Sequence, residues 1–287
     1  MQSSHLIRLA GIVFTAMSFI VLGDTAGKLV MGAGVDPIFV AWTRFAIAAL
    51  VMLPLCGIKR HEWIIFTDWR VILRGLLIAM GISCILTGLR TEPIANVFGA
   101  FFIGPIVSFI LAIVILGERA SPGRAALLVT GFLGVLLVVK PGFGFSPGLG
   151  WALAAGMFYG AFLVTTRVAA PHYRPRLLLL SHLVIGGVVL MPFGATADWP
   201  APDVPTIALI LGSSAGSTIG NYLIVVANRQ ADAALVAPLI YTQLISATAV
   251  GYLVFGDWPD AWSLAGLLVI LASGLGTLWL VRSRVRP

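Results

Sequence analysis

The chain has 287 residues, of which 59% are hydrophobic and only 10% are charged. A soluble globular protein carries about 25% charged residues, and the mean hydropathy of +1.03 is also far from that of a soluble domain. The net charge of +7 fits the cationic loops of a membrane protein better than it fits nucleic-acid binding. The composition therefore predicts a polytopic membrane protein with the lipid bilayer, and no nucleic acid, as its partner.

Ten apolar segments, each long enough to cross a bilayer as a helix, follow one another along the chain. Their connecting loops are short and leave no room for a soluble domain or a cofactor domain. The predicted fold class is an all-α polytopic membrane protein with ten transmembrane helices. The approximate spans are Leu6–Met31, Pro37–Cys56, Arg70–Leu89, Ile94–Gly117, Ser121–Val139, Pro147–Ala169, Leu177–Thr196, Val204–Ala227, Ala233–Phe255 and Ala261–Val281.

The charges of the loops predict the orientation of these spans. With the N-terminus inside, 14 of the 18 Lys and Arg residues are cytoplasmic, Lys28, Arg90 and Lys140 are outside, and Arg44 lies within a span. This asymmetry is typical of the positive-inside rule. The chain also has no N-x-[ST] sequon. We therefore expect a multi-pass protein of the bacterial inner membrane with both termini cytoplasmic.

A shift of 139 residues superposes the two halves of the chain. The stretch Ala95–Glu118 returns as Ala234–Asp257, and both copies end in Gly followed by a carboxylate. Other matches include Gly81 with Gly220. Five spans per half is an odd number, so the second half enters the membrane from the opposite side, as in many secondary transporters. The pattern predicts two inverted five-helix repeats, 1–140 and 147–287.

Charged side chains inside a bilayer are costly and call for an explanation. Asp24 lies four residues before Lys28 in the first span, and Arg44 lies in the second span. Asp24 is either a gating or proton-responsive carboxylate or the acidic member of a structural pair with Lys28 or Arg44, which the i,i+4 spacing favours. Glu118 and Asp257 either cap helix ends or help to close alternate gates. The candidate gating or coupling residues are thus Asp24, Arg44, Glu118 and Asp257.

Polar and aromatic side chains of the middle spans are candidates for contact with a substrate, because transporter sites lie near the midplane at the repeat interface. Several are related by the 139-residue shift, such as Phe102 and Tyr241, or Ser83 and Tyr222. Interhelical packing or hydrogen bonding is the alternative role for each of them. An apolar, aromatic site of this kind suits a neutral or zwitterionic solute. The candidates are Ser83, Thr87, Phe102, Tyr159, Asn221, Tyr222, Tyr241 and Gln243.

Other motifs limit the chemistry of the chain. Pro105 and Pro238 interrupt the fourth and ninth spans at positions that are not repeat-equivalent, so we expect kinks that are not symmetric. Cys56 and Cys84 belong to no metal-binding or redox motif, and no HExxH or correctly spaced P-loop occurs. The sequence therefore predicts a protein that is not an enzyme, with no cofactor and no metal.

Several short motifs carry a resemblance to a known family. They are Gly117-Glu118-Arg119 with Ser121-Pro122, Gly256-Asp257 in the second half, the Gly23–Lys28 stretch with its echo Tyr159–Arg167, and Arg44-Phe45. With ten short-looped spans, the chain resembles the EamA-type drug/metabolite transporter superfamily, and within it the YddG-like amino-acid and metabolite exporters. Asp257 and Gln243 depart from the Glu residues usual there. The resemblance implies a basket of helices around a central cavity, with the fifth and tenth spans packed aside.

These observations favour a secondary transporter that works by alternating access. The resemblance implies export of amino acids with aromatic or bulky neutral side chains, or of similar small metabolites. The alternatives are a multidrug or other metabolite transporter of the same fold, a channel, and an intramembrane enzyme or assembly factor. A small-molecule solute is the expected partner. The oligomeric state stays open, and a monomer is compatible with the sequence.

Overall fold

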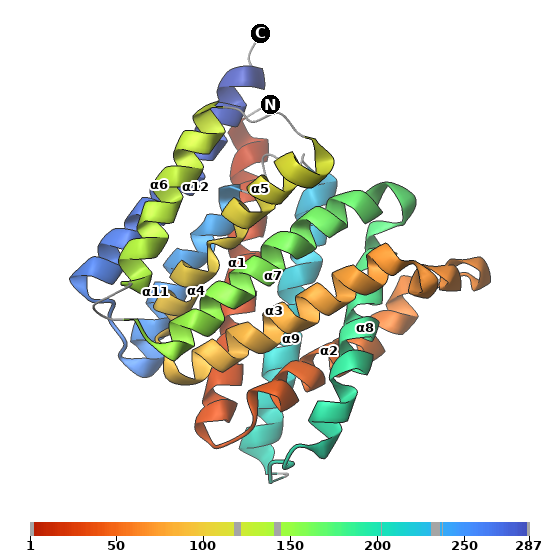
Figure 1. Ribbon diagram of the computed structural model, residues 1–287. Coiled ribbons are helices and arrows are strands. Elements are labelled where there is room, and N and C mark those ends of the chain that lie inside the picture. Colours follow the sequence, from red (N-terminus) through yellow and green to blue (C-terminus); the bar gives the residue numbers. More distant parts are fainter. Residues whose placement is uncertain are drawn as a thin grey trace.

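The computed structural model describes residues 3–117, 122–140, 145–201, 203–230, 236 and 238–285, in which every regular element is helical. Figure 1 shows a bundle of long, tilted helices whose first and last turns lie at the same end. The elements are α1 (Ser3–Gly32), α2 (Pro37–Cys56), the 3-10 helix η1 (Arg60–Thr67), α3 (Trp69–Thr91), α4 (Ile94–Phe101), α5 (Gly104–Leu116), α6 (Pro122–Val139), α7 (Pro147–Ala169), η2 (Ala170–His172), α8 (Pro175–Thr196), α9 (Val204–Gln230), η3 (Ile240–Thr242), α11 (Gln243–Phe255) and α12 (Ala261–Val285).

Seven helical segments of the described chain are long and apolar enough to cross a membrane, and three further apolar helices are shorter. The surface between the helix ends is apolar as well: the side chains of Val114 and Leu253 are 74% and 79% exposed. In water such a surface would be unfavourable, whereas lipid tails accept it. The prediction of a multi-pass, all-helical membrane protein is confirmed.

Local signals explain where the helices begin and end. Asp36 caps α2, because its Oδ1 accepts a hydrogen bond of 2.7 Å from the main-chain N–H of Ile38. Ser146 caps α7 in the same way through Leu149. At the other ends, α5 and α11 both stop at a glycine in the left-handed conformation, which costs little only without a Cβ. Each Gly-carboxylate motif found in the sequence thus begins with a helix C-cap.

Two of the predicted spans are interrupted. The fourth divides into α4 and α5, and the ninth divides into η3 and α11. Pro105 cannot donate to the carbonyl of Phe101, which opens the helix there. α5 and α11 have 13 residues each and begin 139 positions apart. The expectation of kinks without symmetry was therefore wrong: the breaks fall at Phe102 and Tyr241, three residues before Pro105 but three residues after Pro238.

Four pairs of helices make the most extensive contacts, namely α1 with α9, α3 with α7, α6 with α12 and α2 with α8. Small residues allow the close approach. A Cβ added at Gly220 would lie 2.6 Å from the carbonyl oxygen of Ala16 in α1, and one at Gly88 would lie 2.8 Å from the carbonyl oxygen of Gly148 in α7. These glycines thus allow helices of one chain to pack closely, as small residues do in membranes.

Candidate functional site

The centre of the candidate site is a contact between two aromatic rings. Phe102 follows the last turn of α4 and Tyr241 lies in η3, so each ring stands at the break of its span. The rings are stacked, with centroids 4.6 Å apart and planes inclined by 23°. The two positions are equivalent under the 139-residue shift. The structure therefore brings together one pair of residues that the sequence analysis had proposed for substrate contact.

A series of aromatic rings continues from this centre, and we call it the aromatic ladder. The ring centroid of Phe101 lies 6.2 Å from that of Phe102 and 5.0 Å from that of Tyr159 in α7. The ring centroids of Tyr159 and Phe162 are 5.8 Å apart. The ladder thus consists of five rings drawn from η3, α4 and α7: Tyr241, Phe102, Phe101, Tyr159 and Phe162. The sequence analysis missed Phe101 and Phe162, although each lies within one helical turn of a proposed residue.

Few polar groups lie near the breaks, and most of them already form hydrogen bonds within the protein. Gln243, the first residue of α11, is buried. One turn further along α11, Ser246 Oγ lies 2.8 Å from Ser18 Oγ of α1. The hydroxyls of Ser83 and Thr87 donate to carbonyl oxygens of their own helix, α3. Their oxygen atoms can still accept a hydrogen bond from a solute.

The face of α3 that carries Ser83 and Thr87 is accessible. Met80 on the same face is 48% exposed, and the two polar side chains are half-buried. The corresponding face of α9 is accessible too, with Tyr222 40% exposed and Asn221 exposed. These two residues are therefore not packed into the aromatic centre, and the structure separates them from the pair that it brings together.

Asp24 and Arg44 form a buried ion pair between α1 and α2. The Asp24 Oδ1 and Arg44 Nη1 atoms are 2.5 Å apart, and both side chains are 4% exposed. Ser214 of α9 donates to the carbonyl oxygen of Arg44. Within the part of the chain that is described, Arg44 Nε is buried without a hydrogen-bond partner. The geometry pairs Asp24 with Arg44 and not with Lys28. A role of Asp24 in gating or coupling is a separate proposal.

Lys28 takes part in a different group of contacts, which we call the Glu92 latch. The Lys28 ammonium donates to the main-chain oxygen of Glu92 between α3 and α4. Ser146 Oγ, at the start of α7, donates to Glu92 Oε1 over 2.5 Å. The Lys28 ammonium also lies 5.0 Å from the ring centre of Phe255 at the end of α11. The latch therefore connects four helical elements from both halves, and the sequence analysis did not predict it.

The other proposed gate residues lie at helix ends. Asp257 follows the C-cap of α11, is half-buried, and donates its main-chain N–H to the carbonyl oxygen of Gly251. Glu118 lies outside the described residues. Asp257 follows Phe255 of the latch by two residues in the sequence. Among the described candidates, Asp24 and Arg44 are paired with each other, whereas Asp257 lies just beyond the end of α11.

The fold defines a multi-pass membrane protein, and its candidate site lies where two of the membrane-spanning segments are interrupted. The sequence profile of the EamA-like transporter family matches the chain at residues 8–140 and again at 146–279. The chain therefore belongs to the EamA-like transporter family, within the drug/metabolite transporter superfamily. Its members are transporters, so the prediction that the chain is not an enzyme is confirmed.

Two named relatives cover nearly the whole chain. A riboflavin transporter of Rhizobium johnstonii is 27% identical over 96% of this chain and 90% of its own length. An S-adenosylmethionine uptake transporter of Rickettsia bellii is 27% identical over 85% of this chain and 84% of its own. A solved crystal structure with 16% identity superposes with a TM-score of 0.66 and covers 99% of this chain and 100% of that chain, a likeness of fold alone. The chain is similar to transporters of small metabolites.

Proposed function

We propose that the chain is a secondary transporter that works by alternating access, built from two inverted five-helix repeats, 1–140 and 147–287, with ten spans. The pairing of the helices supports the repeat. Exchanging the two halves converts the α1–α9 contact into the α7–α3 contact, and it returns α2–α8 and α6–α12 to themselves. The helices α5 and α11 support the repeat as well, because they begin and end at positions 139 residues apart. Inverted repeats with interrupted helices at the midplane are typical of such transporters.

The stack of Phe102 on Tyr241 is the single observation that carries the proposed substrate class. Planar rings stack on aromatic side chains, and both residues stand at helix breaks where the backbone is open. We propose a small neutral or zwitterionic solute with a flat, partly apolar ring. Amino acids with aromatic side chains fit this description, and so does riboflavin, for which one relative is named. S-adenosylmethionine, for which another is named, shares the flat ring but carries a net positive charge.

The proposed mechanism uses the Glu92 latch as one gate. Lys28 and Glu92 come from the first half and Phe255 comes from the second, while Ser146 directly precedes the second half as the N-cap of α7. Breaking these contacts releases α1 from α7 and α11 at the end of the bundle away from the termini. The charged residues Asp24, Arg44, Glu118 and Asp257 are proposed to set the balance between the two states. The chain has no nucleotide-binding motif, so the gradient of the solute or of an ion drives transport.

The proposed location is the bacterial inner membrane with both termini cytoplasmic. The distribution of Lys and Arg supports this orientation. With this orientation, the Glu92 latch lies at the outer face of the membrane and forms the outer gate. Export of amino acids is the direction that the family resemblance implies, and it is the direction that we propose for cells. In vesicles, the imposed solute gradient sets the direction.

The test is uptake into proteoliposomes of labelled aromatic amino acids, riboflavin and S-adenosylmethionine, with and without an imposed pH gradient. We expect saturable uptake of at least one of these ring-bearing solutes. Phe102→Ala should raise the half-saturation concentration by about twofold to tenfold, because one stacked ring contributes roughly 0.5–1.5 kcal/mol. Phe132→Ala, a change on the exposed surface of α6, is the control. Folded protein that transports none of the solutes, or a Phe102 variant with unchanged kinetics, would contradict the proposal.

A further inference from the structure

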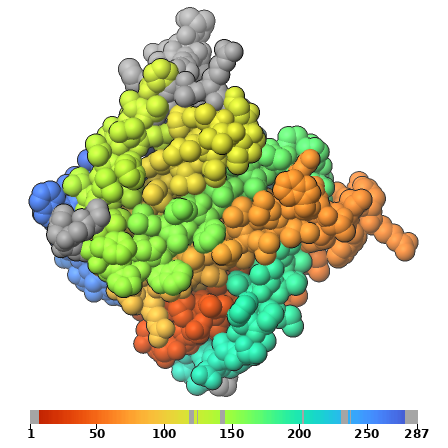
Figure 2. All heavy atoms as spheres, in the orientation of Figure 1, coloured from red at the N-terminus to blue at the C-terminus, as the bar shows by residue number. Residues whose placement is uncertain are grey.

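The 3-10 helix η1 projects from the bundle between α2 and α3. Figure 1 shows it beyond the ends of both helices, and Figure 2 shows its surface extending sideways from the molecule. Its sequence, RHEWIIFT, joins aromatic and aliphatic residues to three ionisable ones, Arg60, His61 and Glu62. Packing within the protein accounts for Ile65 and Phe66, so it is the exposed apolar side chains that call for an explanation.

Contacts with the second half of the chain hold η1 in place. Ile65 is fully buried in a cluster with residues of α2, α3 and α8. The Arg174 guanidinium, in the link between α7 and α8, donates to both oxygens of Glu62, over 2.7 and 2.6 Å. The Tyr173 hydroxyl donates to Asp68 over 2.8 Å. This bonding to Arg174 holds the pKa of Glu62 below its usual value. The element is therefore a fixed surface and not a loose loop.

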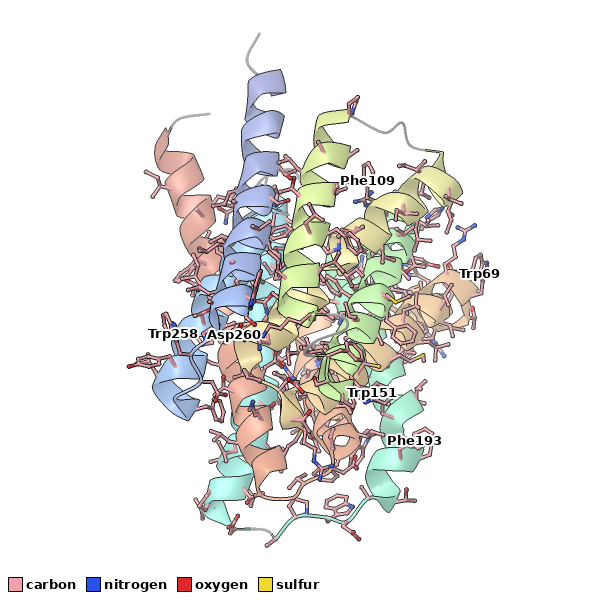
Figure 3. The ribbon with its side chains drawn as sticks, turned by 60° about the vertical axis from the view of Figure 1, so that its left-hand side comes forward. Trp69, Phe109, Trp151, Phe193, Trp258 and Asp260 are labelled. Carbon is pink, nitrogen blue, oxygen red and sulfur yellow. The ribbon has the colours of Figure 1, made fainter. Side chains whose placement is uncertain are left out.

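One part of this surface is apolar and uncovered. Trp63 is 54% exposed, and Ile64 and Trp69 are each 67% exposed. In Figure 3, Trp69 stands at the edge of the molecule. Tryptophan is the residue most typical of the membrane–water interface, where its ring is apolar and its N–H stays hydrated. Exposed apolar residues on a short helix at the end of a transmembrane bundle therefore indicate contact with the interfacial layer of the bilayer.

The surroundings of these residues are cationic. Lys59, Arg60 and His61 are exposed, and the Arg70 guanidinium lies 6.0 Å from the ring of Trp69. The two carboxylates of the segment already accept hydrogen bonds from protein groups. Five cations thus stand against two carboxylates: Lys59, Arg60, Arg70, Arg174 and Arg176 against Glu62 and Asp68. The surface offers an excess of positive charge beside its apolar side chains.

We propose that residues 59–70, together with Tyr173 and Arg174, form an interfacial platform that binds the head groups of anionic phospholipids. Trp63, Ile64 and Trp69 enter the boundary between head groups and acyl chains. Arg60 and Arg70 bind the lipid phosphates, for which guanidinium groups have suitable geometry. The partner is a lipid because it alone offers negative charge and an apolar layer at the same depth. This inference needs no transported solute and stands apart from the proposed function.

The first experiment titrates purified protein in detergent with phosphatidylglycerol or phosphatidylcholine and follows bound lipid by native mass spectrometry. We expect preferential retention of phosphatidylglycerol. The Arg60→Gln and Arg70→Gln variants should each bind it about fivefold more weakly. Arg90→Gln, which removes an exposed cation at the other end of the bundle, should bind as the unchanged chain does. Equal retention of the two lipids, or equal losses in all three variants, would overturn the proposal.

A second experiment locates the apolar residues without relying on charge. The protein is reconstituted in bilayers that contain lipids brominated near the head group, and the quenching of tryptophan fluorescence is measured. Replacing Trp63 and Trp69 with Phe should remove a large share of the quenched emission. Replacing Trp42, which is half-buried and packs against Phe39 and Trp199, should remove less. If the Trp63 and Trp69 emission is not quenched, the platform faces water or a protein partner, and the proposal is wrong.

Discussion

Two buried arginines lie at meeting points of three helices that correspond under the proposed repeat, and their partners differ; we call these meeting points joints. Arg44 lies where α1, α2 and α9 meet and is paired with the carboxylate of Asp24. Arg74 lies where the counterparts α7, α8 and α3 meet. It donates to the hydroxyl of Thr166 and to the carbonyl oxygen of Leu178, both over 2.7 Å, and its guanidinium stands 4.6 Å from the Phe162 ring. The same architecture therefore accommodates a cation in two ways.

The difference concerns what happens when a partner is lost. A buried ion pair depends on both members, because removing one leaves an uncompensated charge. A cation that is held by neutral acceptors and an aromatic face depends on no single partner. The joint at α1, α2 and α9 is thus predicted to be the more sensitive one to mutation. It is also the joint that contains the candidate coupling residue Asp24.

The largest effect is expected for Asp24→Asn. This change leaves the Arg44 guanidinium buried without a counter-charge, which should lower the free energy of unfolding by about 3–5 kcal/mol. Denaturant or thermal unfolding in detergent measures it. The double variant with Arg44→Gln should recover much of the loss, because no charge is then buried. A single variant as stable as the unchanged chain would remove the distinction between the joints.

Gly220 and Gly81 are equivalent positions that test the same two joints through packing. A Cβ at Gly220 would lie 2.5 Å from Ile20 and 2.6 Å from the Ala16 carbonyl oxygen, whereas one at Gly81 has its nearest neighbour at 3.6 Å. Gly220→Ala should therefore cost about 1–3 kcal/mol of stability. Gly81→Ala should be neutral or stabilising by up to about 1 kcal/mol, because alanine favours a helix. Similar thermal shifts for both variants would show that the joints are packed alike.

Arg74→Met should have a smaller effect than Asp24→Asn. The change removes two hydrogen bonds to a charged group, but it also removes the cost of keeping that charge out of water. We expect a net loss of about 1 kcal/mol in unfolding free energy. Arg74→Ala, which also leaves a cavity beside Phe162, serves for comparison and should cost more. If Arg74→Met lowers the free energy of unfolding as much as Asp24→Asn does, the two arginines depend on their partners equally and the proposed difference between them is wrong.

The smallest effect is expected for the exposed pair of Lys140 and Asp260, which connects the end of α6 with the start of α12. Partial burial raises the pKa of Asp260, but hydrogen bonds from Lys140 and Ser263 outweigh it and bring the pKa to about 2. Its stabilisation is therefore present above the ordinary pKa of about 4 and disappears as the pH falls towards 2. At neutral pH, Asp260→Asn should cost a few tenths of a kcal/mol.

The measurement compares melting temperatures of the unchanged chain and of Asp260→Asn between pH 7 and pH 2. The difference between the two proteins should shrink as the pH falls and vanish near pH 2. A difference that grows in acid would have the wrong sign for a carboxylate with a lowered pKa.

Membrane insertion, the helical fold and the family were predictable from the sequence, because apolar spans and the Gly-carboxylate motifs are local signals. The stack of Phe102 and Tyr241 was accessible as a pair of equivalent positions, since the 139-residue shift relates them. The sequence left two possible partners for Asp24, Lys28 and Arg44. The i,i+4 rule favours Lys28, whereas the packing of α2 against α1 brings Arg44 to Asp24. The Glu92 latch was not predictable, since one of its contacts uses a main-chain oxygen.

The kinks show why local rules can mislead. Proline predicts where a hydrogen bond is missing, and Pro105 and Pro238 differ in register. The two breaks nevertheless fall 139 residues apart, because the one at Phe102 lies before its proline and the one at Tyr241 lies after its proline. The position of a proline therefore does not by itself fix where a helix breaks.

The position of the Phe102–Tyr241 contact has a mechanical consequence. Under the proposed repeat, a contact between equivalent residues lies on the two-fold axis that relates the halves. When the halves exchange conformations, contacts away from the axis are replaced by their counterparts, but a contact on the axis is converted into itself. The stacked rings can then act as a fulcrum. A solute beside them would meet the same neighbours in both states, while access to it passes from one face of the membrane to the other.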